Sequence, residues 1–201
     1  MEGAIKYNIT YSSETDANQN SFLFPKEMML FFKNDMQKLS LKGGLGMYNI
    51  DFIYGSDSDT IIALLNIGLL SKKLYLKSTN PNLFIFSEAN NSEVTLVIDE
   101  IKEFAGLTAK KAVIKSGLGN TQDIEVWYTD EISVNTPNRN TPFEKIPGIL
   151  LESKISYKNI TFSFQAEKID SCSVSDETFI VPADFQLTTI KEIEDLVNTV
   201  F

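Results

Sequence analysis

The side chains that could carry acid and base chemistry in this sequence are carboxylates. Asp99-Glu100, Asp130-Glu131 and Glu152 are candidates for a pair of carboxyl groups of the kind used in retaining or inverting glycoside hydrolysis. Nothing in their spacing brings two of them into one cleft, so solvated strand edges are the better interpretation. The chain has no histidine, which excludes Ser-His-Asp and Cys-His catalysis, histidine metal sites and histidine pH switching.

Other motifs are too incomplete to predict a bound ligand. Gly43-Gly44-Leu45-Gly46 lacks the Lys-Ser/Thr that follows in a phosphate-binding loop, so it predicts a hairpin turn. Asp57-Ser58-Asp59 resembles the start of a calcium loop but lacks the third oxygen ligand, the glycine and the closing glutamate. Cys172 is the only cysteine, which excludes an intrachain disulfide and a cysteine-cluster metal site. We therefore expect no catalytic residues, no metal and no cofactor.

Composition and charge narrow the class of protein. The 201 residues predict a single domain, 1–201, long enough to bury a core of its own. The net charge of −9 disfavours nucleic acid as a partner. No apolar run approaches the ~20 residues of a membrane span, and the first residues do not have the pattern of a signal peptide. Either the protein is cytosolic or a leader has been removed.

Strand patterns dominate the chain, and they position any site. Apolar and polar residues alternate through much of it, as in Ile5, Tyr7, Ile9 and Tyr11. The expected strands are 4–12, 27–33, 36–42, 48–54, 60–67, 73–77, 94–101, 109–115, 123–129, 149–157 and 160–169. Residues 78–92 fit a lid, a short helix or an inserted loop equally well.

One helix is expected at the C-terminus. Thr189 and Glu192 have capping-box spacing, and Ile190, Ile193, Val197 and Val200 form one apolar stripe. The fold class is therefore mainly β (α+β). We expect a strongly curved, open antiparallel sheet or partial barrel, with the C-terminal helix and loop material on its concave side.

Two features could be more than ordinary core. Trp127 shares a strand face with Glu125 and Thr129, so either a helix or loop covers it or it contacts a ligand or partner. The strand Met28 to Phe32 is apolar on both faces, so either it is covered twice or it presents a surface to something hydrophobic.

Several segments carry a family resemblance over nearly the whole chain. The run Val126-Trp127-Tyr128-Thr129-Asp130-Glu131-Ile132, followed by Pro147-Gly148-Ile149-Leu150-Leu151, resembles the GLPGLI family of secreted Bacteroidota proteins. It resembles the related domain of unknown function 4412 more closely. Phe104-Ala105-Gly106, before Ala109-Lys110-Lys111-Ala112, and Pro182-Ala183-Asp184-Phe185 are similar to further segments of that group. Two departures are Ala109 in place of a family cysteine and Lys145-Ile146 in place of Gly-Leu.

The resemblance implies a fold like that of the periplasmic lipoprotein carrier LolA. It also implies export, so we expect a periplasmic, outer-membrane-associated or secreted protein whose leader is missing from this chain. The leading hypothesis is a non-enzymatic protein that binds a lipid or acyl chain in the hollow of the sheet. The candidate ligand-binding residues are Met28, Leu30, Phe32, Trp127, Phe162 and Phe164.

The rival hypothesis is a cell-envelope interaction or assembly module with a filled core. Its candidate partner-binding residues are Leu83, Phe84 and Phe86, with Trp127 as a further contact. The first three form a short apolar run within residues 78–92, whose secondary structure the sequence does not predict. A wide apolar cavity would favour the carrier, whereas a filled concave side with an exposed aromatic patch would favour the module.

Overall fold

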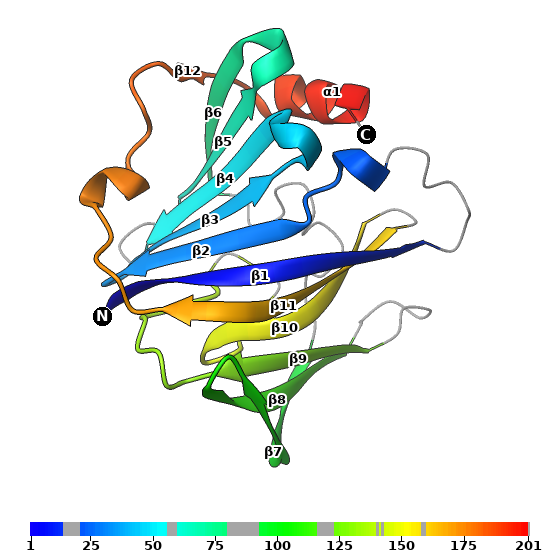
Figure 1. Ribbon diagram of the computed structural model, residues 1–201, viewed down its shortest axis with the longest axis vertical. Coiled ribbons are helices and arrows are strands. Elements are labelled where there is room, and N and C mark those ends of the chain that lie inside the picture. The colour runs from blue at the N-terminus through cyan, green and yellow to red at the C-terminus, as the bar shows by residue number, and fades with distance from the viewer. Residues whose placement is uncertain are drawn as a thin grey trace.

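One large, curved sheet makes up most of the molecule. The computed structural model describes residues 1–13, 21–55, 60–79, 93–115, 123–139, 141, 143–157 and 160–200. Within that part of the chain, twelve strands form a sheet with the order β12-β6-β5-β4-β3-β2-β1-β11-β10-β9-β8-β7. All neighbouring strands are antiparallel except β12 and β6, and the sheet stays open between β7 and β12 (Figure 1).

The bounds of the strands are close to those expected from the alternation of side chains. They are β1 (Glu2–Ser13), β2 (Glu27–Lys33), β3 (Met36–Lys42), β4 (Tyr48–Gly55), β5 (Ile61–Ile67), β6 (Lys72–Ser78), β7 (Glu93–Phe104), β8 (Leu107–Lys115), β9 (Ile124–Thr129), β10 (Ile149–Tyr157), β11 (Ile160–Asp170) and β12 (Gln186–Leu187). The short 3₁₀ turns are η1 (Ser21–Leu23), η2 (Gly44–Gly46), η3 (Gly68–Leu70) and η5 (Asp176–Phe179), and the helix is α1 (Ile190–Val200).

The pairing of β1 with β11 joins two meanders into this sheet. Strands β1 to β6 are hydrogen-bonded in chain order, and so are β7 to β11. β1 and β11 then pair over their whole length, from Ala4 opposite Asp170 to Ser13 opposite Ile160. At Gly3 the strands are so close that a Cβ would lie 2.6 Å from the carbonyl oxygen of Asp170. The two halves of the chain therefore share one concave surface.

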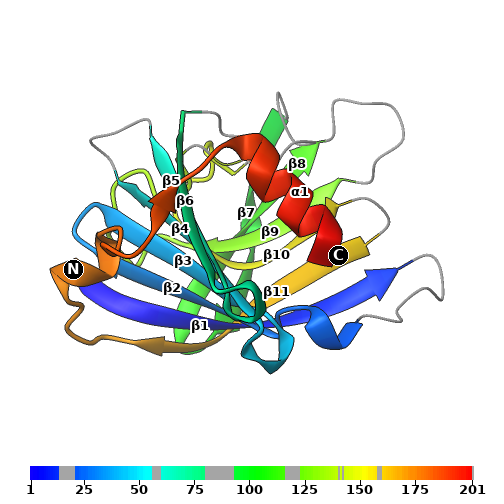
Figure 2. The same ribbon diagram turned by 90° about the horizontal axis from the view of Figure 1, so that it is seen from above.

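Helix α1 lies over the concave side, as expected (Figure 2). The Thr189 hydroxyl accepts a hydrogen bond from the Glu192 N–H at 3.3 Å, so the predicted cap is present. Ile193 is buried against strands β4 to β6, with Leu196 beside it. The expected apolar stripe of the helix is wrong at Ile190, which is exposed. The helix is oriented so that Ile193 and Leu196 face the sheet instead.

The convex side is covered by coil that the sequence did not assign to it. Val174 and Phe179, from the segment after β11, pack on Ile53 and Leu64 of β4 and β5. Phe143 and Ile146 likewise cover outward-facing residues of β8 and β9. The doubly apolar strand β2 is buried on its concave face and partly covered on the other, where Phe31 packs under the first of these coils.

The segments that carry the family resemblance have structural roles. Ala105 and Gly106 have φ of 49° and 85° and make the two-residue turn between β7 and β8. Gly148 is required because a Cβ there would lie 2.3 Å from the carbonyl oxygen of Thr129. Asn138 holds the preceding coil in place by donating to the carbonyls of Ile146 and Gly148 at 2.9 and 2.8 Å.

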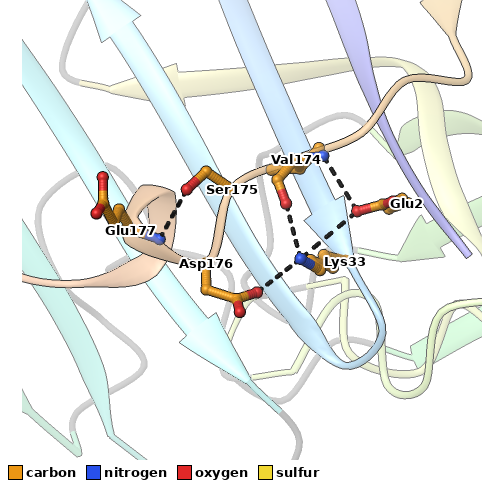
Figure 3. A network of polar contacts seen from close by, with 6 residues as sticks. All are labelled: Glu2, Lys33, Val174, Ser175, Asp176 and Glu177. Carbon is orange, nitrogen blue, oxygen red and sulfur yellow. Dashed lines mark hydrogen bonds and ion pairs between the residues drawn. The ribbon is translucent and has the colours of Figure 1, made fainter.

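A polar cluster fastens the coil after β11 to the start of β1 and the end of β2 (Figure 3). Lys33 donates to the carbonyl of Val174 at 2.8 Å and pairs with Asp176 at 2.6 Å. Glu2 accepts from the Val174 N–H at 3.1 Å and lies 3.7 Å from the Lys33 ammonium. The Val174 N–H lowers the pKa of Glu2, and the Asp176 carboxylate raises the pKa of Lys33.

This Lys33 cluster predicts how the coil responds to mutation and pH. Lys33→Met should weaken amide-hydrogen protection over residues 173–180, because it removes the cation that three partners share. In the wild-type protein, the protection should be full between the ordinary titration ranges of glutamate and lysine. It should fall in acid as Glu2 binds a proton, and in alkali as Lys33 loses one. Hydrogen exchange corrected for intrinsic rates measures the effect of Lys33→Met and the effect of pH on this protection. Lys168→Met is the control for the loss of a surface cation.

Candidate functional site: the concave apolar face

The concave face carries an apolar surface that runs across both meanders. Its main part is a buried cluster formed by Ile5, Tyr7, Ile9, Met28, Leu30, Phe32, Phe104, Ala109, Trp127, Ile132, Ile149, Leu151, Phe164 and Ala166. A second cluster on β4 to β6 includes Tyr48, Phe52 and Leu65. Leu39 and Leu41 of β3 contact both clusters, so the surface is continuous from β9 to β6.

Strand alternation places most of the predicted ligand-binding residues on this face. Met28, Leu30, Phe32, Trp127 and Phe164 all belong to the main cluster, although they come from strands far apart in the sequence. Phe162 is half-buried at its margin, 5.2 Å from the ring of Tyr11 in an edge-on contact. The structure therefore gathers the six residues along one face.

The predicted partner-binding residues are not placed. Leu83, Phe84 and Phe86 lie outside the described residues, as does the Asp57-Ser58-Asp59 motif.

Two bulges adjust which side chains reach the concave face. In β11, the register with β1 shifts at Glu167, so Ile169 packs on the same cluster as Ala166 despite its odd spacing. In β10, the register with β9 shifts at Leu151, which is fully buried in the main cluster. Simple alternation could not place Ile169, whereas Leu151 keeps the alternation of Ile149 and Ser153.

Tyr7 crosses the concave face and ties the two meanders together. Its hydroxyl donates to the carbonyl of Leu150 at 2.7 Å, next to the bulge in β10 and two strands away. Its ring meets Phe164 edge-on at 5.8 Å. Burial, and secondarily the nearby Tyr54, raises the pKa of Tyr7, so its hydroxyl keeps its proton and remains a donor.

Two polar side chains are buried on this face without a hydrogen-bond partner for one atom each. They are Gln37, which stands between Phe32 and Tyr54 in the register, and Ser153, opposite Phe164. Both residues are 1% exposed, and neither the Gln37 Oε1 nor the Ser153 Oγ has a partner. Such an unpartnered buried atom costs about 1–3 kcal/mol of folding free energy. The sequence analysis missed both residues, although each follows the alternation of its apolar neighbours.

Trp127 lies at the charged margin of the face. Lys102 stands 4.3 Å from the centre of its ring, and Lys111 stands 5.9 Å away. Lys111 also pairs with Glu125 at 2.9 Å, which lowers the pKa of Glu125. Trp127 is 5% exposed, in a cluster with Phe104 of β7, Ala109 of β8 and Ile132 of the coil after β9.

Most of the carboxylates considered for acid–base chemistry have polar partners on the surface of the sheet. The Lys110 ammonium lowers the pKa of Asp130, and the Thr108 backbone and hydroxyl lower the pKa of Glu131. Glu100 is exposed and paired with Lys111, while Glu152 lies 3.9 Å from Lys102. A general acid needs a raised pKa, whereas the pKa values of Asp130 and Glu131 are lowered.

Neither a metal centre nor a membrane-spanning helix is found in the described part of the chain. No three acidic or cysteine side chains gather there in a way that could hold an ion. No helix in the same residues is long and apolar enough to cross a bilayer.

Known proteins offer only distant likenesses. No protein-family model and no curated protein matches the chain, so the GLPGLI and domain of unknown function 4412 resemblance stays a prediction. Among solved structures, the chain is similar to the Mycobacterium tuberculosis lipoprotein LppX, at 11% identity and a TM-score of 0.39, over 86% of this chain and 89% of that one. It is also similar to LprF from Mycobacterium bovis, at 10% identity and a TM-score of 0.35, over 90% and 89%.

A third likeness is to MucB, at 8% identity and a TM-score of 0.37. It covers 92% of this chain but 58% of MucB. At such identities and TM-scores, ligand and activity have to be argued from this chain's own side chains.

The Tyr7 bridge gives a testable prediction. Tyr7→Phe should lower the free energy of unfolding by about 1–3 kcal/mol, because it leaves the Leu150 carbonyl without its donor. Urea denaturation measures the change as a lower midpoint at an unchanged slope. Tyr75→Phe, on the convex side, is the matched control and should change stability by less than about 0.5 kcal/mol. Equal losses in the two variants would contradict the role given to the bridge.

Proposed function

We propose that this protein binds a hydrophobic ligand, such as a lipid or acyl chain, on the concave side of its sheet. The observation that carries the proposal is the pair of buried, unpartnered polar atoms, Gln37 Oε1 and Ser153 Oγ, on an otherwise apolar face. An amphiphile offers both chemistries that this face presents, since its chain is apolar and its polar end can donate a hydrogen bond. Binding would remove the cost of the unpartnered atoms.

The positions of the two atoms define where a polar end would lie. Gln37 is close in register to Gly3, at the start of β1, whereas Ser153 is in register with Ile9, six residues further along that strand. At about 3.3 Å a residue, the two backbone positions are separated by about 20 Å along the strand direction. An acyl chain between them, with a polar group at one end, would have to displace the side chains that now bury Ile5, Tyr7 and Leu30.

We further propose that the protein acts by binding alone and works outside the cytoplasm. The absence of histidine from the sequence and the lowered pKa values of Asp130 and Glu131 support binding over catalysis. The resemblance to exported Bacteroidota proteins supports a periplasmic, outer-membrane-associated or secreted location.

Native mass spectrometry of the full chain, purified without detergent, tests the proposal. We expect an added mass that lipid extraction removes, and displacement of a fluorescent fatty acid by the extracted material. Neither bound lipid nor competition would count against ligand binding and in favour of an interaction module with a filled core.

Variants of the two polar residues test the site itself. Ser153→Ala should raise the apparent Kd for the fluorescent fatty acid about threefold to tenfold, the effect of one lost hydrogen bond. Gln37→Leu is the corresponding variant at the other end. Ser163→Ala is the matched control, because Ser163 alternates with Phe164 and faces the convex side. Higher stability of both variants with an unchanged Kd would show that the two atoms do not meet the ligand.

A further inference from the structure

Three turns at one end of the sheet expose large apolar side chains. They are η1 before β2, η2 between β3 and β4, and η3 between β5 and β6, which lie along the same rim (Figures 1 and 2). The exposed side chains, with their exposed fractions, are Phe22 (53%), Leu45 (85%), Leu69 (72%) and Leu70 (51%). We call these four residues the apolar rim.

The three turns are held against one another. The Gly68 N–H donates to the carbonyl of Met47 at 3.1 Å, which joins η3 to the end of η2. A Cβ on Gly44 would lie 1.6 Å from the carbonyl oxygen of Phe22, so η2 packs directly on the backbone of η1. The apolar rim is therefore one surface, and its parts cannot move independently without breaking these contacts.

Leu45 is the most exposed side chain of the rim and has an unusual backbone. Its φ is 58°, in the left-handed region that favours glycine, and it stands between Gly44 and Gly46. Glycine would fit this position without strain. The leucine side chain packs on little of the protein itself, so we expect it to contact another molecule.

The charge around the rim differs from that of the whole chain. Segments 21–26, 42–47 and 68–73 contain four lysines and no aspartate or glutamate, although the chain has a net charge of −9. Lys72 and Lys73 pair with Glu192 and Asp184 from the C-terminal part of the chain. Lys26 and Lys42 are exposed and pair with no carboxylate of the described residues.

We propose that the apolar rim docks on the surface of a lipid bilayer. Four apolar side chains on adjacent turn tips match the acyl boundary of a membrane, and flanking lysines match the phosphates just above it. Lysine side chains suit this place because their stems lie along apolar surface while the ammonium stays at the headgroups. The proposal does not depend on a ligand on the concave side.

Vesicle flotation with the full chain tests this inference. We expect the wild type to float with vesicles of equal parts phosphatidylcholine and phosphatidylglycerol, and more weakly with phosphatidylcholine alone. The variant Leu45→Gly with Leu69→Ser should lower the partition coefficient at least about tenfold. Leu45→Gly also relieves the backbone, which keeps the variant folded. Lys26→Gln with Lys42→Gln should remove the preference for the anionic vesicles.

The control is Leu96→Ser with Ile98→Ser, two exposed apolar residues of the edge strand β7. This variant should float like the wild type. Failure of the wild type to float with either vesicle, or equal losses in the control, would overturn the proposal. A third outcome is that the wild type self-associates, the rim variant does not, and neither binds vesicles. That result would overturn the proposal and make the apolar rim an interface between two copies of the chain. Fatty-acid displacement by the rim variant should stay unchanged, which separates this test from that of the concave face.

Discussion

The pairing of β1 with β11 is the constraint on which the rest of the structure depends. It joins two meanders that would otherwise be separate sheets, because it pairs the first strand of one with the last strand of the other. The close approach at Gly3 and the Tyr7 hydrogen bond to Leu150 act at this junction. Since the sheet curves across it, side chains from strands as distant as β2 and β9 meet in one cluster.

A sheet of this size has two faces to cover, and the chain covers them in different ways. Coil before β10 and after β11 packs on the convex face, and it is fastened by Asn138 and by the Lys33 cluster. The described side chains of helix α1 that pack on the sheet, Ile193 and Leu196, lie on the part of the concave face formed by β4 to β6. The rest of the concave face is the main cluster, which contains most of the predicted ligand-binding residues and is shielded from solvent within the described structure.

Much of the fold could be predicted from the sequence because strand alternation is a local property. Strands 27–33, 36–42 and 149–157 were expected with the bounds that the structure has, and the curved open sheet with a C-terminal helix is confirmed. The placement of Met28, Leu30 and Phe32 on one face followed from the same alternation.

The rest depends on contacts between distant segments, which alternation does not encode. The bulge at Glu167 changes which residues of β11 face inward, and the exposed Ile190 shows that a helix stripe does not fix how a helix is turned. Gln37 and Ser153 are buried although they are polar, because each alternates with apolar neighbours on the concave face. The apolar rim was missed because Gly43 to Gly46 predicted a turn but not the three turns packed together.

Trp127 offers the most direct measurement of the central claim, that a hydrophobic ligand binds on the concave face. It is the only tryptophan in the chain and belongs to the main concave cluster, so its fluorescence reports on that face alone. A fatty acid brominated along its chain quenches indole emission at short range. The account predicts saturable quenching of Trp127 that the unbrominated fatty acid reverses. Unchanged Trp127 emission, at concentrations where the same fatty acid is shown to bind, would place the ligand elsewhere and contradict the account.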